Sequence, residues 1–359
     1  MNHYVFFSKP KNPPLTGGDR FHNEVLFSLE RAGNKVNYIS VGDAPKVFRN
    51  FLLFNLRLIW QMRQHSRSVF ILDFYYHPWS FLAVWLIKYW FNCKVVVSTR
   101  GIYFIDKGIA VYWLSRFMAY ILLKPADLLI VNSSWTREEL CKRGARNKKC
   151  AVIPPGVDLP EIKKCPKSIN RGKVQLLSVG NCVPVKRIDK LIEAISLLDK
   201  EKYHLTIMGE TTDDIKYFNK IQKMIISKGL QENVSFIGFL KGQRKTDEYQ
   251  KADIFVHSSM AEGYGIVLVE AMYFGLPVVA CRVGAIPELI KDKINGFLVA
   301  PDNPLEFSSA ITLLMEDETL RGNMSRRNMD DYKEQAYTWG QVRNIFIEKL
   351  IAGLGKRKE

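Results

Sequence analysis

The 359-residue sequence has no apolar run long enough to cross a lipid bilayer. A membrane-spanning helix needs about 20 apolar residues, whereas the longest apolar stretch, Trp79–Phe91, has 13 residues and contains Lys88. The first residues also lack the charged start and the apolar core of a secretory signal peptide. We therefore expect a cytoplasmic protein without a membrane span.

Patterns that bind metals or form disulfides are missing as well. The six cysteines are scattered, no Cys-x-x-Cys occurs, and no histidine cluster has the spacing of a zinc site. The sequence also has no low-complexity run or internal repeat, which would indicate disorder or a solenoid. We expect a globular protein with free thiols in a reducing compartment.

Basic residues are concentrated in the first half of the chain. Residues 1–165 contain 24 Lys and Arg against 11 Asp and Glu, a net charge of +13, and the remaining 28 and 25 leave +3 for residues 166–359. Six of the seven tryptophans lie in the same half. Basic side chains beside amphipathic aromatic ones suit an anionic membrane surface or an acidic partner.

Three segments of the first half allow both a structural and a functional interpretation. Trp79–Phe91 is either a buried core helix or an interfacial helix that rests on lipid. Val47–Arg67 fits a basic amphipathic helix or a structural helix with a solvated charged face. The basic run Lys142–Lys149 is interpreted as a solvated face rather than a recognition patch.

Apolar strand-like runs alternate with helical patterns in both halves of the chain. This alternation is typical of βαβ units around a parallel sheet. A polar segment between Pro160 and Lys173 separates the two halves. We predict an α/β protein with two Rossmann-like, doubly wound domains, residues 1–165 and 166–336, that face each other across a ligand-binding cleft.

The stretch AEGYGIVLVEAM, Ala261–Met272, has two glutamates eight positions apart. Glu262 lies in the loop after a predicted strand, and Glu270 lies on an apolar face of a predicted helix, where a carboxylate needs a partner. The loop glycines let the backbone approach a ligand, and the first N–H groups of the helix favour a phosphate. The alternative is a solvated loop glutamate and a helix glutamate paired with a nearby lysine.

The longer segment Ala252–Pro304 resembles the signature block of the retaining, nucleotide-sugar-dependent glycosyltransferases with the GT-B fold, the glycosyl transferases group 1 of family four. That block has Glu-x7-Glu, then Gly-x-Pro-Val-Val and Gly-x-x-Pro-Glu. The residues that match after the glutamates are Gly275, Pro277, Val278, Val279, Gly284, Pro287, Glu288, Asn295 and Gly296. The likeness extends over most of the chain and includes Ile153–Asp158 and Ser178–Asp189.

The resemblance implies roles for individual residues. Glu262 would bind hydroxyls of the donor sugar, Glu270 would bind the ribose hydroxyls, and Lys186 would pair with the diphosphate. The backbone that supplies amides to the phosphates would be that of Gly263, Tyr264, Gly265, Ile266 and Val267. The other residues implied near the donor are Gly17 and Gly18 in an N-terminal loop, Gly180 and Asn181 in the phosphate loop, and Gly209, Phe239 and Leu240 at strand ends that line the nucleotide pocket.

Some positions depart from the family pattern. Asn181 stands where arginine is common, and Arg187 follows Lys186 where glycine is frequent. Arg187 either replaces the missing charge or points elsewhere, which would weaken the diphosphate site. Arg100, in a motif similar to one in some relatives, would contact the donor phosphate or the acceptor, unless it forms a structural salt bridge. His77 either faces the acceptor or is packed.

The resemblance implies a hexosyltransferase that moves a hexose from a UDP- or GDP-linked sugar with retention, by front-face attack. No Asp-x-Asp stands at a plausible strand end, so we expect no metal, and no cofactor beyond the donor substrate. The acceptor would be a glycolipid or a surface polysaccharide, including lipopolysaccharide, with the enzyme peripheral on the inner face of the membrane. The segment 337–359 would return to the first domain.

Other functions remain as alternatives. A sugar-nucleotide epimerase or a phosphorylase would share the architecture, but epimerases have other cleft residues, and phosphorylases need a pyridoxal phosphate lysine and far longer chains. A nucleic-acid-binding module would account for the net charge of +16, but the sequence has no RNA-binding motif. We therefore expect no nucleic-acid partner.

Overall fold

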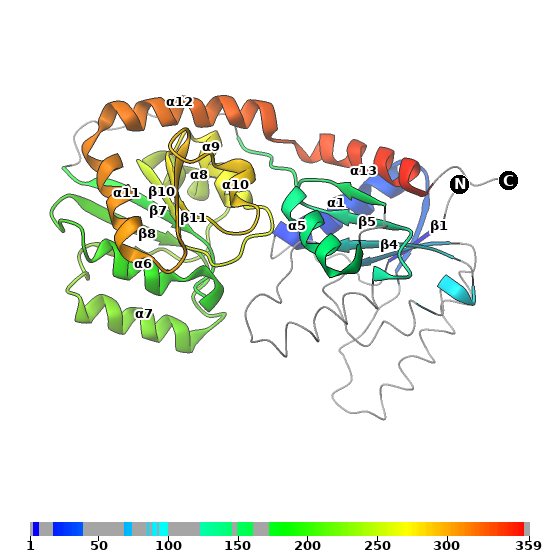
Figure 1. Cartoon of the computed structure of the whole chain (residues 1–359), viewed down its shortest axis with the longest axis horizontal. Helices are drawn as coiled ribbons and strands as arrows, with labels where there is room; N and C mark the ends of the chain where they lie inside the picture. Colours follow the sequence, from blue (N-terminus) through cyan, green and yellow to red (C-terminus); the bar gives the residue numbers. More distant parts are fainter. Residues whose placement is uncertain are drawn as a thin grey trace. The chain divides into compact units, whose positions relative to one another are not determined.

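The computed structural model describes residues 3–6, 17–38, 68–73, 85, 88–91, 93–99, 123–145, 149–160 and 172–354. His77, Arg100 and Val47–Arg67 lie outside the described residues. The chain divides into two compact units, Met1–Gly156 with Tyr337–Glu359, and Val157–Ala336 (Figure 1). None of the described helices has the length and apolar content needed to cross a membrane.

The first unit contains a six-stranded parallel sheet in the order β2-β1-β3-β4-β5-β6. Its strands are β1 (His3–Phe6), β2 (Lys35–Tyr38), β3 (Val69–Asp73), β4 (Lys94–Thr99), β5 (Leu128–Val131) and β6 (Cys150–Val152). The described helical segments before the last one are α1 (Gly17–Arg31), α5 (Ser134–Leu140) and the π-helix η2 (Cys141–Ala145). The central strands β4 and β5 are almost continuously buried, as is usual for a parallel sheet.

The C-terminal helix α13 (Trp339–Leu354) belongs to the first unit. Its buried Trp339 and Phe346 join Phe21 of α1 in one apolar cluster, and the two helices lie side by side in Figure 1. Arg343 Nη1 lies 2.6 Å from Glu24 Oε2 of α1. The end of the chain therefore completes the unit that the beginning of the chain forms.

The second unit contains a six-stranded parallel sheet in the order β12-β11-β10-β7-β8-β9. Its strands are β7 (Val174–Val179), β8 (Tyr203–Met208), β9 (Val234–Phe236), β10 (Ile254–His257), β11 (Val278–Cys281) and β12 (Gly296–Val299). Its helices are η3 (Pro184–Lys186), α6 (Ile188–Ile195), α7 (Ile215–Ser227), α8 (Gly242–Lys251), α9 (Ile266–Tyr273), α10 (Ile286–Leu289), α11 (Pro304–Glu316) and α12 (Glu318–Gln335).

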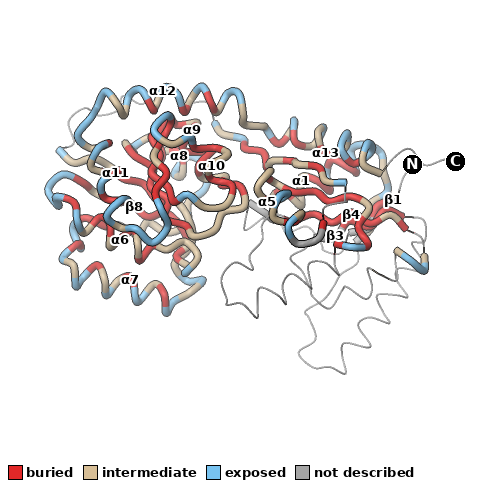
Figure 2. The backbone as a smooth tube through the Cα atoms, in the orientation of Figure 1, coloured by how far each residue is buried: buried red, intermediate tan, exposed pale blue. Residues whose placement is uncertain are grey.

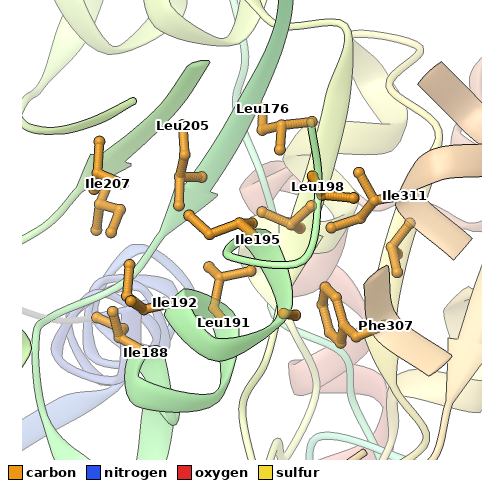
Figure 3. Close-up of a cluster of buried hydrophobic side chains, with 14 of the residues drawn as sticks. Leu176, Ile188, Leu191, Ile192, Ile195, Leu198, Leu205, Ile207, Phe307 and Ile311 are labelled. Atoms are coloured by element: carbon orange, nitrogen blue, oxygen red, sulfur yellow. The ribbon is translucent and has the colours of Figure 1, made fainter. Parts of the chain in front are cut away.

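Helices cover both faces of this second sheet. Side chains of α6, α7 and α11 pack with the strands in one buried cluster, part of which Figure 3 shows. Side chains of α8, α9 and α10 pack with the strands in a second cluster. In Figure 2 the buried strands accordingly run through the interior of the unit, with exposed residues on the outer helices. The second unit is therefore doubly wound.

The division between the two units lies between Gly156 and Val157, upstream of the expected boundary at residue 165. Val157 is buried in the cluster of α8 and α9, and Leu159 packs against the same cluster. The hydroxyl of Tyr273 in α9 also donates to the carbonyl oxygen of Pro160. These residues belong to the second unit because their side chains complete its core.

Candidate functional site

The strand order of the second sheet reverses at its first strand, β7. β10 pairs with β7 on one side, and β8 pairs with it on the other. In open α/β sheets, ligands bind beyond the carboxyl ends of the strands at such a switch point. The loops after β7 and β10 carry Lys186 and Glu262. The candidate site therefore lies where these two loops meet.

Hydrogen bonds hold the two loops together. The Met260 N–H donates to the Val185 carbonyl oxygen at 2.9 Å, and the Ser258 hydroxyl donates to the Lys186 carbonyl oxygen at 2.8 Å. The Lys186 side chain also passes over Gly180, where an added Cβ would lie 3.4 Å from Lys186 Cε. The positions of Lys186 and the Glu262 loop are therefore coupled.

Lys186, Glu262 and His257 form a charged cluster. Lys186 Nζ lies 3.0 Å and His257 Nε2 lies 3.4 Å from the same Oε2 atom of Glu262. Burial alone would raise the pKa of Glu262, but Lys186 and His257 outweigh burial and hold that pKa well below its ordinary value. Burial lowers the pKa of His257, and together with the Lys186 charge it outweighs the opposing effect of the Glu262 carboxylate. At neutral pH the cluster is an ion pair beside a neutral imidazole.

The Glu262 loop is also fixed by the loop after β11. Gly284 has a φ of 55°, and an added Cβ there would lie 2.0 Å from the Glu262 carbonyl oxygen. The N–H of Ala285 donates to the same oxygen at 2.9 Å. A residue with a Cβ would push this loop away, so the close approach requires glycine at position 284.

Helix α9 begins directly after the Glu262 loop. Gly265 is its N-cap with a φ of 98°, and Ile266 and Val267 are its first residues. The first N–H groups of a helix have no intrahelical acceptor, and the helix dipole makes this end positive. Gly263 is partly exposed, and Tyr264 is buried. The loop that carries Glu262 thus leads directly into the N-terminus of α9, which favours the binding of anions.

Glu270 lies inside α9 and is 6% exposed. Lys245 Nζ lies 2.5 Å from its Oε1 atom, and the Tyr249 hydroxyl donates to its Oε2 atom at 2.7 Å. Glu270 therefore has the lysine partner that the structural interpretation requires. A carboxylate has about four acceptor sites, so these two contacts are also compatible with hydrogen bonds from a ligand.

Arg187 and Asn181 are held by acidic residues. Arg187 has a φ of 49°, forms an ion pair with Asp302, and places its Nε atom 3.6 Å from Asp189 Oδ1. Asn181 donates its side-chain N–H to Asp213 Oδ2 at 2.6 Å. Arg187 thus points to two carboxylates, and these contacts favour the second of the two interpretations of this residue. Of Lys186 and Arg187, Lys186 is therefore the cation that is available to a diphosphate at the candidate site.

The other predicted residues of the second unit follow β7, β8 and β9. An added Cβ on Gly209 would lie 2.1 Å from the Gly180 carbonyl oxygen, so the ends of β7 and β8 approach closely. Phe239 is 51% exposed, and Lys241 Nζ lies 5.2 Å from the centroid of its ring. Leu240 is partly buried and packs against the cluster of α8 and α9.

Four predicted residues belong to the first half of the chain. Gly17 and Gly18 are the first two residues of α1, so the helix begins with them rather than after them. His77 and Arg100 lie outside the described residues.

Three residues of the site were not predicted from the sequence: His257, Lys245 and Tyr249. His257 interrupts an apolar strand at its last position, which is a detectable signal for a polar group at a strand end. Lys245 and Tyr249 are four residues apart on α8 and therefore share one helix face. Their common partner lies on another helix, which the spacing does not reveal.

Two family models match the chain. Residues 161–334 match glycosyl transferases group 1. Residues 16–161 match the model named glycosyltransferase family 4. The two matches follow one another along the chain and together cover residues 16–334.

Curated relatives match shorter parts of the chain. An uncharacterized 41.2 kDa protein in the cps region of Klebsiella pneumoniae is 29% identical over 247 residues, which are 66% of this chain and 65% of the relative. The D-inositol 3-phosphate glycosyltransferase of Geodermatophilus obscurus is 26% identical over 243 residues, 63% of this chain and 52% of the relative. The matched part thus spans between half and two thirds of the length of these relatives.

A solved structure resembles the whole chain. The crystal structure of Anabaena HepE (Alr3699) in complex with UDP and glucose has a TM-score of 0.77 at 17% identity, and the match covers 98% of this chain and 100% of that one. At this identity the similarity is evidence for the fold alone. The two family matches show that the chain belongs to the group 1 glycosyltransferases. The two parallel-sheet units and the likeness to HepE show that it has the GT-B fold.

Proposed function

We propose that this protein transfers a hexose from a nucleoside diphosphate sugar to an acceptor, with retention of configuration. The observation that carries the proposal is the Lys186–Glu262 pair beside the first turn of α9, at the switch point of the second sheet. The leaving nucleoside diphosphate gains negative charge as the glycosidic bond breaks. A fixed ammonium group and helix amides directed at that charge stabilise the transition state more than the ground state.

Each charged group of the cluster has a role in this proposal. Lys186 and the N–H groups of Ile266 and Val267 bind the diphosphate, whose oxygen accepts the proton of the attacking acceptor hydroxyl. Glu262 accepts hydrogen bonds from hydroxyls of the donor sugar. The lowered pKa of Glu262 supports this role, because the ionised carboxylate accepts and does not donate.

We further propose that Glu270 binds the ribose hydroxyls of a UDP- or GDP-linked donor. The UDP in the structure of HepE makes UDP the first nucleotide to test. Lys245 and Tyr249 support the role of Glu270, because they hold both carboxylate oxygens within a buried environment.

Glu270→Ala should weaken the binding of the matching nucleoside diphosphate at least about tenfold, because hydrogen bonds to a charged acceptor are lost. The measurement is isothermal titration with UDP, GDP and ADP. The control is Glu193→Ala: Glu193 Oε2 lies 2.7 Å from Lys190 Nζ on a partly exposed turn of α6, and the affinity of this variant for the nucleotide should be unchanged. If none of the three nucleotides shows saturable binding to the unchanged protein, the proposed donor site is wrong.

The acceptor is proposed to be a glycolipid or a surface polysaccharide that the first unit reaches while resting on an anionic membrane. The basic, tryptophan-rich first half supports this proposal. In the described part of Trp79–Phe91, the side chains of Tyr89 and Trp90 are 59% and 79% exposed, and Lys88 lies beside them in sequence. Lys88 itself pairs with Asp127 at 2.5 Å, so the support here comes from the two exposed aromatic rings, which suit a bilayer interface.

Replacing Tyr89 and Trp90 together by alanine should reduce binding to phosphatidylglycerol vesicles about tenfold, because two rings no longer bury apolar surface in the interface. Sedimentation with these vesicles measures the change. The control is Ile226→Ala, which removes a residue of the second unit that is 61% exposed. Equal sedimentation of the double variant and the unchanged protein would contradict this membrane surface.

A further inference from the structure

His257 is a buried imidazole at the end of β10, with 2% of its surface exposed. Its ring lies nearly parallel to that of Phe255, at an interplanar angle of 18°. Within the described part of the chain, its buried Nε2 atom has no hydrogen-bond partner of normal geometry. The group that this atom faces is Glu262 Oε2, at 3.4 Å. Through this atom, the buried ring can act on a ligand by way of Glu262.

Lys186 and His257 contact the same carboxylate oxygen in different ways. The Lys186 ammonium group is carried by a long, flexible side chain that is 26% exposed, and the proposed function gives it to the diphosphate. His257 is held by its strand and by the packing around it. We therefore expect its contact with Glu262 to remain when Lys186 binds a phosphate.

We propose that His257 is the positioning residue of the donor-sugar site: its Nε2–H donates to Glu262 Oε2 and holds the carboxylate in the orientation that accepts the sugar hydroxyls. The inference rests on the proposed function, in which Glu262 binds the donor sugar. An ionised carboxylate only accepts hydrogen bonds, so this contact requires the tautomer of the neutral ring that carries its hydrogen on Nε2. The lowered pKa of His257 agrees with a neutral ring.

Three substitutions separate hydrogen-bond donation from packing. Glutamine at position 257 places an amide nitrogen near the position of the imidazole Nε2, asparagine places one near Nδ1, and leucine fills the space without a donor. Isothermal titration measures the dissociation constants of UDP and UDP-glucose, with GDP and GDP-mannose in parallel. Thermal melting of each variant tests whether it is folded.

His257→Leu and His257→Asn should weaken the binding of the nucleotide sugar about tenfold and that of the nucleoside diphosphate less than about twofold, whereas His257→Gln should retain most of the affinity. The affinity for UDP or GDP depends on Lys186 and α9. A variant that loses affinity only for the nucleotide sugar has therefore lost the contribution of Glu262. If His257→Leu does not fold, the asparagine and glutamine variants still give the comparison.

The inference is overturned if the asparagine and glutamine variants lose equal affinity for the nucleotide and the nucleotide sugar, since that result assigns His257 a structural role. It is also overturned if all three variants bind the nucleotide sugar as the unchanged protein does. A failure of the proposed function looks different, because the unchanged protein itself would then bind neither UDP-glucose nor GDP-mannose.

Discussion

Lys186→Met should lower kcat for glycosyl transfer by about 10²- to 10³-fold, because removing one group that stabilises developing charge has an effect of this size. Methionine keeps much of the aliphatic chain that passes over Gly180, so the packing should be retained. The rate is measured with the donor that titration identifies and with an accepted glycan or glycolipid. Lys190→Met is the matched control, since Lys190 pairs with Glu193 at a partly exposed position of α6 and its loss should not affect kcat.

The same substitution should make donor binding depend on pH. Burial raises the pKa of Glu262, and the Lys186 charge is the largest of the effects that outweigh it. In the unchanged protein the depressed pKa keeps Glu262 ionised as the pH falls through the ordinary carboxylate range. In Lys186→Met the pKa of Glu262 should rise, because His257 alone then opposes the effect of burial, and affinity for the nucleotide sugar should fall at acidic pH where the unchanged protein still binds. Equal rates and equal pH profiles for the Lys186 and Lys190 variants would remove Lys186 from the proposed mechanism.

The two parallel sheets could be predicted because strands buried on both faces are continuous apolar runs. Val278–Cys281 is such a run, and all of its residues are buried. The end of the first unit could not be placed in the same way. Val157 and Leu159 follow two prolines in a segment without periodicity, and they belong to the second unit because of the core that they reach. A boundary of this kind depends on tertiary packing, which a local pattern does not contain.

The candidate site shows the same limit. The sequence indicates that Glu270 needs a partner, because a carboxylate on an apolar helix face is costly. It does not identify Lys245 and Tyr249, which lie 25 and 21 positions away on another helix. Lys186 and Glu262, 76 positions apart, meet because β7 and β10 are neighbours in the sheet. Strand order creates these contacts, so the family resemblance could suggest them where periodicity could not.

The sequence allows two interpretations of Glu262 and Glu270, either as a ligand-binding pair or as structural residues. The structure contains features of both interpretations. Glu270 is paired with a lysine, as the structural interpretation has it, but it is too deeply buried for a lysine pair on a helix surface. The Glu262 side chain is 17% exposed, which excludes a solvated loop glutamate. Glu262 has Lys186 at 3.0 Å and the His257 ring at 3.4 Å, and Glu270 has Lys245 and the Tyr249 hydroxyl. Both carboxylates keep acceptor capacity for hydroxyl groups.

Gly284→Ala should reduce kcat/KM for the nucleotide sugar at least about 100-fold, because a displacement of about 1 Å in a group that positions the substrate has this effect. The added Cβ would lie 2.0 Å from the Glu262 carbonyl oxygen, and the obstructing atom is backbone. The Glu262 loop must therefore move, which breaks the hydrogen bond from Ala285 and shifts the carboxylate away from Lys186 and His257.

Gly33→Ala is the matched control for this substitution. Gly33 has a φ of 74°, and an added Cβ there has nothing within 4 Å, so alanine experiences the left-handed strain without a collision. Both variants should be destabilised by about 1–2 kcal/mol from this strain, with a further loss at position 284. Melting temperatures measure the stability of each variant. Titration with UDP and UDP-glucose measures the affinity of its donor site. If Gly284→Ala binds the nucleotide sugar as tightly as Gly33→Ala does, the Glu262 carboxylate does not depend on its loop, and its proposed contact with the donor sugar loses its structural basis.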